Sequence, residues 1–411
     1  MISKDLTRLL GEQSLATRML RRGFRAYKRG VWAVFDFAYG LWERWRRREP
    51  APPTKARAVL HVSMLSHKPY MLSRIMRRHG VKSDYLAVHP EAGWLQVGTR
   101  GYDFALPGSL LGMPLRPFFE IRCLLKMLAD YDVIHYHFAS LLTYEGRELK
   151  YLKRAGKCVV FHFRGCDLRQ GSVNRRLHPE LNCCAECDSP TGSCETEIQS
   201  LRIELAREYA DLLFVTTPDL LDFLPEAELV PFIAPTEVVL ADIRPAPRNA
   251  NVFRVVTSSN HDGIDGTAYV RRAVERLQQE GHAIELVEVH GTPYEQALAV
   301  YKSADLYAGK LLMGFYNNAN IECMLLGVPC MTYIRPEFQG SIPDCPIIVA
   351  RPDTLYGLIR QHMNEREALR ALGERGPAFV HRHHDSDRVV DLILARYDAV
   401  LRRRSGRSAP R

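Results

Sequence analysis

Polar side chains gather in the segment 304–334, around a loop rich in Gly and Asn. The pattern predicts a strand over 305–308, the loop over 309–318 and a helix over 319–326 that stops before Gly327. Loops that lead from the C-terminal edge of a strand into a helix are where α/β proteins hold phosphates and nucleotides. Glu322, one turn into the helix, is placed to bind a ligand hydroxyl. The segment therefore predicts a nucleotide site, and an ordinary βαβ unit with a solvated Glu322 is the alternative.

A second polar group follows the apolar strand predicted over 158–163. His162, Arg164, Asp167 and Arg169 lie close together at the end of that strand. An imidazole can donate a hydrogen bond to a ligand oxygen, and guanidinium groups bind anions. Asp167 can accept from a hydroxyl or pair with Arg169. The group predicts a ligand-binding loop, and a structural His–Asp–Arg network is the alternative.

Two further histidines, His135 and His137, occupy alternate positions of the strand predicted over 132–137. Alternate residues of a strand point to the same face of the sheet, so one face of this strand is polar at its end. We expect His137 to face a ligand, and a buried, hydrogen-bonded histidine is the alternative.

Five of the ten cysteines lie between Cys166 and Cys194, in a segment rich in Pro, Gly and Asp. Soft ligands at this spacing are typical of a structural, tetrahedral zinc site. The predicted ligands are Cys183, Cys184, Cys187 and Cys194, with His178 as an alternative fourth. The N-terminus lacks a secretory cleavage pattern, so we interpret the cysteines as reduced, and packing cysteines are the alternative to zinc ligands.

The elements that carry these residues alternate between strand and helix, first over 58–216 and again from 253. Such alternation indicates parallel sheets covered by helices on both faces, and 411 residues suit two domains. The predicted organisation is an N-terminal domain (56–240) with a Cys-rich insertion near 178–194, a boundary within 235–251, a C-terminal domain (250–380) and a last helix (386–402). A Pro-rich linker over 49–54 separates the N-terminal domain from a basic helical segment, 1–50.

Charge is concentrated at the ends of the chain. Residues 1–50 hold 12 Lys/Arg against 5 Asp/Glu, and the last ten residues hold five Arg, so the remainder carries about −3 of the net +9. A body without a basic face argues against a nucleic-acid-binding protein. Trp32, Phe35, Tyr39 and Trp42 form one stripe of the N-terminal helix and are flanked by cations. We expect residues 20–48 to lie on an anionic membrane surface, and a helix packed on the protein itself is the alternative.

The segment 304–334 resembles the donor-site signature E-G-F-G-x4-E-A-M-A-x-G-x-P-V of family-4-like, GT-B-fold glycosyltransferases. Glu322 matches the second Glu, which binds the nucleotide ribose in the family, and Gly327 and Pro329 match the Gly and Pro that follow. Gly314 stands where the family has its first Glu. The run 159–169 resembles the H-x-G-x-D-x-R segment of bacterial surface-polysaccharide enzymes, in which His162 matches a His close to the donor sugar.

The resemblance implies a fold of two Rossmann-like domains, a nucleotide-sugar donor, and no metal in catalysis. His162 and Asp167 would be catalytic, and Arg164, Arg169 and His137 would bind the acceptor. Positions implied or expected to bind the donor are Glu322, Lys310, Gly314, Asn317, Asn320, Asn260, Gly266 and Thr267.

The loop 256–267 departs from the family pattern S-N-R-x-x-K-G-T, because Asp262 and Asp265 replace the Arg and Lys that clamp the diphosphate. Like charges at close range are costly unless they are compensated. Lys310 can substitute for the missing cations, a divalent ion can bridge the acids to phosphate, or the site has lost activity.

The reaction we expect is retaining transfer of a sugar to a lipid-linked glycan in cell-surface polysaccharide synthesis. It would take place in the cytoplasm, at the inner face of the plasma membrane. A non-catalytic glycan- or partner-binding protein and a nucleotide-sugar epimerase remain alternatives.

Overall fold

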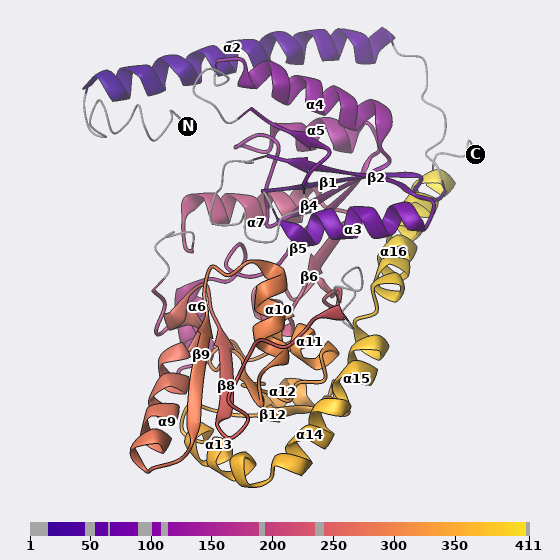
Figure 1. Cartoon of the computed structure of the whole chain (residues 1–411). Helices are drawn as coiled ribbons and strands as arrows, with labels where there is room; N and C mark the ends of the chain where they lie inside the picture. Colours follow the sequence, from indigo (N-terminus) through magenta and orange to yellow (C-terminus); the bar gives the residue numbers. More distant parts are fainter. Residues whose placement is uncertain are drawn as a thin grey trace. The chain divides into compact units, whose positions relative to one another are not determined.

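The computed structural model describes residues 15–45, 54–64, 66–88, 101–107, 114–188, 194–234 and 242–407. The chain divides into two compact units (Figure 1). Unit 1 comprises Met1–His162, Leu205–Leu212 and Leu394–Arg411, and unit 2 comprises Phe163–Glu204 and Leu213–Ile393. The predicted linker lies outside the described residues up to residue 53, and the predicted boundary 235–251 is described from residue 242 onward.

The first sheet is parallel, with seven strands in the order β3-β2-β1-β4-β5-β6-β7. Its strands are β1 (Ala58–Ser63), β2 (Lys82–Ala87), β3 (Phe104–Ala105), β4 (Val133–His137), β5 (Cys158–Phe163), β6 (Leu212–Val215) and β7 (Glu228–Leu229). The α-helices up to β7 are α2 (Leu15–Trp45), α3 (His67–Arg78), α4 (Arg116–Asp130), α5 (Arg147–Arg154), α6 (Gly171–Leu177) and α7 (Glu197–Tyr209). The inner strands β1, β4 and β5 are buried along their whole length, as their apolar composition requires.

The second sheet, in unit 2, is also parallel and has the order β12-β11-β10-β8-β9. Its strands are β8 (Phe253–Ser258), β9 (Ile284–Val289), β10 (Leu306–Ala308), β11 (Cys330–Thr332) and β12 (Ile347–Val349). The helices from here on are α8 (Asp262–Asp265), α9 (Thr267–Gln279), α10 (Tyr294–Lys302), α11 (Asn318–Leu325), α12 (Pro336–Gln339), α13 (Leu355–Asn364), α14 (Arg366–Glu374), α15 (Gly376–His383) and α16 (Ser386–Arg407).

Strand order reverses next to β8, because β9 lies on one side of it and β10 on the other. Open α/β sheets bind ligands at such a switch point, outside the carboxyl ends of the strands. The loops that follow β8 and β10 are the ones in which the sequence predicts donor contacts. The two Rossmann-like parallel sheets confirm the predicted fold class.

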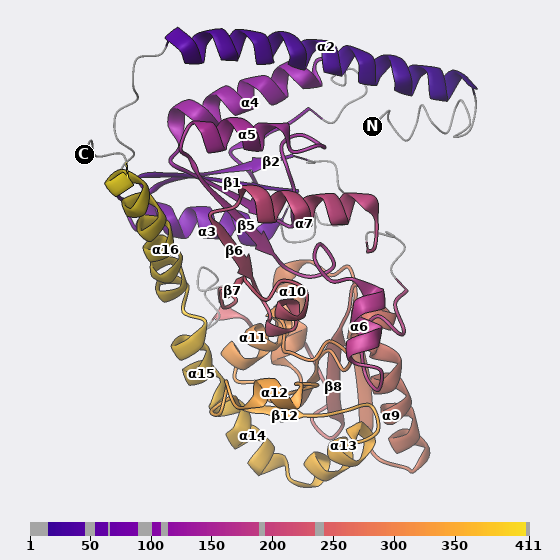
Figure 2. The same cartoon turned by 180° about the vertical axis from the view of Figure 1, so that it is seen from behind.

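The aromatic stripe of α2 packs within unit 1, which is the alternative that we gave for this stripe, and binding of residues 20–48 to an anionic membrane surface stays a prediction. Trp32 is fully buried, and its Nε1–H donates to Glu120 of α4 (3.3 Å). Phe35 and Tyr39 pack against Tyr151 of α5. Both views show α2 lying along α4 (Figures 1 and 2). The side chain of Trp42 lies outside the described residues.

Replacing Trp32 with alanine is expected to lower the free energy of unfolding by about 3–5 kcal/mol, because the change opens a cavity and removes one of the hydrogen bonds that Glu120 accepts. Val34→Ala on the exposed face of α2 is the control, and its effect should stay within about 0.5 kcal/mol. Urea denaturation followed by circular dichroism measures both. Equal effects of the two changes would show that α2 is not docked as described.

Candidate nucleotide-binding site

Two helix N-termini flank the switch point of unit 2. Helix α9 begins at Thr267, in the loop after β8, and α11 begins at Asn318, in the loop after β10. β8 and β10 are direct neighbours in the sheet, so both loops leave the same sheet edge. The amides of a helix's first turn have no partner within the helix and point along its axis toward any bound anion. The arrangement suits a diphosphate.

Asn317 and Asn320 build the start of α11. The Asn317 side chain accepts from the backbone N–H of Asn320 (3.0 Å), and the Asn320 side chain accepts from the N–H of Asn317 (3.1 Å). This capping box fixes the angle at which the chain enters the helix. The Asn320 amide packs on Gly309, where an added Cβ would lie 2.7 Å from Asn320 Nδ2. The loop after β10 is therefore rigid where a ligand would meet it.

Three buried polar atoms near these helix starts have no hydrogen-bond partner within the described part of the chain. They are Thr267 Oγ1, Asn318 Oδ1 and Asn320 Nδ2. A buried polar group without a partner costs free energy, and proteins keep such groups mainly where a ligand or water completes them. Asn260 and Gly266 lie in the same loop as Thr267; Asn260 is exposed, and Gly266 takes a left-handed conformation against Leu312.

Glu322 lies one turn into α11 and is 8% exposed. The hydroxyl of Tyr294, at the start of α10, donates to its Oε1 (3.2 Å). A carboxylate held in this way keeps a fixed orientation and can accept further hydrogen bonds, as a pair of ribose hydroxyls would require. The sequence reasoning missed Tyr294, because nothing in the chain pattern links the start of α10 with α11.

The two acids of the loop after β8 are compensated by nearby cations. Lys310 lies 2.7 Å from Asp265 Oδ1, and Asp265 also accepts from Ser259 Oγ (2.9 Å). Arg271 lies 3.9 Å from Asp262. Because Asp265 is 5% exposed, its charge requires such a partner. Lys310 thus neutralises Asp265, and its role as a substitute for the missing cations at the diphosphate stays a prediction.

Gly314, which replaces the family's first Glu, has φ +85° and touches Arg335. A Cβ at this position would lie 2.7 Å from Arg335 Cγ. Arg335 is itself fixed, since its guanidinium pairs with Asp222 (2.6 Å). The arginine thus crosses the place where a side chain at 314 would begin, and only glycine fits.

Gly314→Ala is expected to destabilise the protein by about 1–3 kcal/mol more than Gly327→Ala. Both glycines are left-handed and share a backbone penalty of about 1–2 kcal/mol, but nothing lies within 4 Å of a Cβ at Gly327. Urea titrations of the two variants isolate the clash with Arg335. Equal destabilisation would show that Arg335 does not occupy this place.

In the loop after β5, the carboxylate of Asp167 accepts hydrogen bonds from backbone N–H groups of the same loop. Asp167 accepts from the N–H groups of Arg164 (3.0 Å) and Gly165 (2.7 Å), and burial raises the pKa of its carboxyl. Burial lowers the pKa of Arg164 to about 10. Arg169 is 2% exposed and pairs with Asp219, a partner that the sequence reasoning did not find. The catalytic role of Asp167 and the acceptor contacts of Arg164 and Arg169 stay predictions.

His162 and His137 end neighbouring strands, β5 and β4, and are paired in register. Both are buried within unit 1. Their predicted roles near the donor sugar and the acceptor also stay predictions.

The cysteines predicted as zinc ligands do not converge, so the structure does not support that site. Cys194 Sγ accepts from the N–H of Gly171 (3.1 Å), Cys187 is exposed, and His178 pairs with Asp222 (2.9 Å). Cys183 and Cys184 are 3.9 Å apart, and their hydrogen bond lowers the pKa of Cys184. Cys183 packs with Ile264 and Leu312, so the Cys-rich segment contributes apolar contacts to the loop after β8.

No family model and no curated protein matches this sequence. Solved structures do match its fold. The catalytic domain of starch synthase IV from Arabidopsis thaliana, bound to ADP and acarbose, aligns with a TM-score of 0.55 at 10% identity, over 86% of this chain and 100% of that one. HepE from Anabaena, in complex with UDP-glucose, aligns with a TM-score of 0.53 at 11% identity, over 83% of this chain and 99% of that one. Sucrose-phosphate synthase from Thermosynechococcus elongatus aligns with a TM-score of 0.52 at 15% identity, over 84% of this chain and 99% of that one. The chain has the GT-B fold of these glycosyltransferases.

Proposed function

We propose that the protein is a glycosyltransferase that uses a nucleotide-sugar donor bound at the switch point of unit 2. One observation carries the proposal. Two helix N-termini, the oriented carboxylate of Glu322 and three buried polar atoms that have no hydrogen-bond partner among the described residues stand at the edge where an open α/β sheet binds ligands. HepE and starch synthase IV, which share the fold, were solved with UDP-glucose and with ADP.

The proposed chemistry follows from where charge develops. Cleavage of the bond between sugar and diphosphate places negative charge on the leaving group, and fixed donors that face this charge lower the barrier. The starts of α9 and α11 would supply backbone N–H groups. Lys310 would neutralise charge directly when it turns from Asp265 to the phosphates. His162 and Asp167 remain our candidates for the catalytic residues, and retention of the anomeric configuration is part of the proposal.

A lipid-linked glycan is the proposed acceptor, with the protein on the cytoplasmic face of the membrane. The support comes from α2, whose Val34, Phe37 and Leu41 recur along one face and are 71%, 71% and 42% exposed. Arg22, Arg29 and Arg44 on the same helix are exposed as well. Apolar side chains beside cations suit the headgroup layer of an anionic bilayer. Among the described helices, none has the length and apolar character to cross a membrane.

The double variant Phe37→Ser/Leu41→Ser is expected to bind anionic vesicles at least ~10-fold more weakly, because each side chain would lose about 1.5–3 kcal/mol of apolar burial. Val349→Ser, an exposed site in unit 2, is the control and should bind as the wild type does. Co-sedimentation with phosphatidylglycerol vesicles measures both. Unchanged partition of the double variant would refute membrane binding through α2.

Donor screening tests the function itself. The purified chain is incubated with UDP-, GDP- and ADP-sugars and a native lipid extract, and products are followed by mass spectrometry. We expect one donor to give an acceptor mass increased by one glycosyl residue, together with free nucleoside diphosphate. Conversion of the donor into an isomeric nucleotide sugar without any acceptor, seen as a chromatographic shift at unchanged mass, would indicate an epimerase instead. Absence of turnover with every donor would contradict the proposal.

A further inference from the structure

Histidine side chains cluster on one face of the first sheet, within unit 1, whereas the proposed donor site belongs to unit 2. His61 of β1 is the register partner of His135 of β4, and His137 is the partner of His162 of β5. Register partners and alternate residues share a face, so all four rings lie on the same side of the sheet. His61, His135 and His137 are fully buried. Their strands meet at β1–β4, where the order of this sheet reverses.

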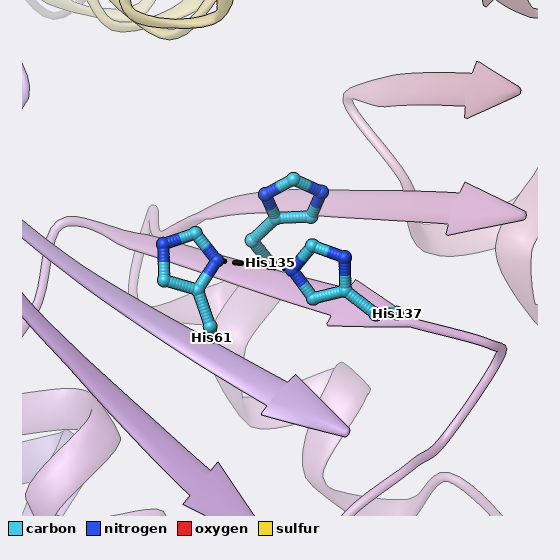
Figure 3. A group of neighbouring side chains, drawn as sticks. All are labelled: His61, His135 and His137. Carbon is cyan, nitrogen blue, oxygen red and sulfur yellow. Dashed lines mark hydrogen bonds between the residues drawn. The ribbon is translucent and has the colours of Figure 1, made fainter. Parts of the chain in front are cut away.

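The geometry of three of these rings resembles a set of metal ligands. Within the described part of the chain, His61, His135 and His137 are the one group of three His, Cys, Asp or Glu residues whose ligand atoms all lie within 4.8 Å of one another. His61 Nδ1 faces His137 Nε2 at 3.0 Å, as Figure 3 shows, and the rings of His135 and His137 are 4.0 Å apart. A tetrahedral zinc ion with bonds of about 2.0–2.1 Å holds its ligand atoms roughly 3.3 Å apart.

We propose that His61, His135 and His137 form a structural site for a divalent transition metal of the zinc class. Three imidazoles suit zinc, copper or nickel and do not suit magnesium or calcium. On binding, the His61–His137 hydrogen bond gives way to two metal–nitrogen bonds, and the donor ring changes tautomer, so that its proton ends on its other nitrogen and both ligands stay neutral imidazoles. The ion would then join β1 to β4 through side chains, in addition to the backbone ladder.

Tyr397 of α16 completes the site as an outer partner. Its hydroxyl lies 2.6 Å from His135 Nδ1. When His135 binds metal through Nε2, its Nδ1–H donates to Tyr397, and such an outer contact fixes the tautomer and the ring orientation of a metal-binding histidine. The ring of His162 lies 5.4 Å from that of His135 and 5.6 Å from that of His137. The metal would thus hold the rings on which His162 packs. The proposal does not depend on the identity of the sugar donor.

Metal binding by the full-length protein tests the proposal. The purified chain is equilibrated with Zn²⁺, freed of excess metal and analysed by mass spectrometry of the elements. We expect about one equivalent per chain and a melting temperature that rises with Zn²⁺. A Co²⁺-loaded sample should show visible bands of a low-symmetry nitrogen site and no thiolate-to-cobalt charge-transfer band. A thiolate band would overturn the proposal and point to the cysteines.

Variants locate the metal. His61→Gln and His137→Gln should each retain less than a tenth of an equivalent. His381→Gln, at an exposed histidine, and Cys184→Ser/Cys187→Ser should retain the wild-type content. If circular dichroism shows that the two histidine variants are misfolded, the cobalt spectrum of the wild type decides between nitrogen and thiolate ligands. Wild-type protein without bound metal at equilibrium, or folded histidine variants with full content, would overturn the proposal.

Discussion

Replacing Glu322 with alanine is expected to weaken the binding of a nucleotide-sugar donor by about 10- to 100-fold, since hydrogen bonds to a charged group contribute about 1.5–3 kcal/mol. The carboxylate is oriented by Tyr294 and is only 8% exposed, so water does not readily take over its hydrogen bonds to the donor after the change. Glu322→Gln keeps the shape of the side chain and one acceptor oxygen, so we expect it to lose less donor affinity than Glu322→Ala. Titration calorimetry with the donor found by screening measures all three proteins.

The control for this change is Glu367→Ala, at an exposed acid on α14 of the same unit. It should bind donor as the wild type does. If Glu322→Ala folds and binds donor with unchanged affinity, Glu322 is not a donor ligand, and the resemblance in this segment does not extend to binding.

The second large effect concerns Lys310 and Asp265. Lys310→Met is expected to destabilise the protein by about 2 kcal/mol, because it leaves a buried carboxylate without its cation; Lys310 is 26% exposed, which keeps the cost below that of a fully buried pair. Donor affinity should fall further than with Glu322→Ala, since the unpaired acid then repels the diphosphate.

Asp265→Asn in the Lys310→Met background removes the repulsion and keeps an acceptor for Ser259. The double variant should recover most of the stability, and urea denaturation of the four proteins of the cycle gives the coupling energy. Lys302→Met, at the end of α10, is the control. A coupling energy near zero would mean that the two residues do not act as a pair.

Much of the fold could be predicted from the sequence, because the alternation of strands and helices, and the Gly and Pro residues at their ends, are local signals. The strand at 158–163 has the predicted bounds, and the helix before Gly327 differs from its prediction by one residue at each end. The first turns of α7 follow the Cys-rich segment and lack a clear apolar period, so the sequence does not mark where this helix begins.

The contacts of the site were harder to predict, because they join residues that are distant in the chain. The pattern of α2 predicts a helix with an aromatic stripe, but it does not say that Glu120 and Tyr151 cover that stripe. Cysteine spacing likewise does not say where each thiol points. The neighbours of His137 include His61, which only the pairing of β1 with β4 brings close.

Calorimetric titration of the full-length chain with UDP-, GDP- and ADP-sugars tests the central claim most directly. We predict saturable binding of one donor per chain at millimolar concentration or below, weakened about 10- to 100-fold in Glu322→Ala and kept in Glu367→Ala. Folded protein that takes up none of these donors at millimolar concentration would contradict the claim that the switch point of unit 2 is a nucleotide-sugar site.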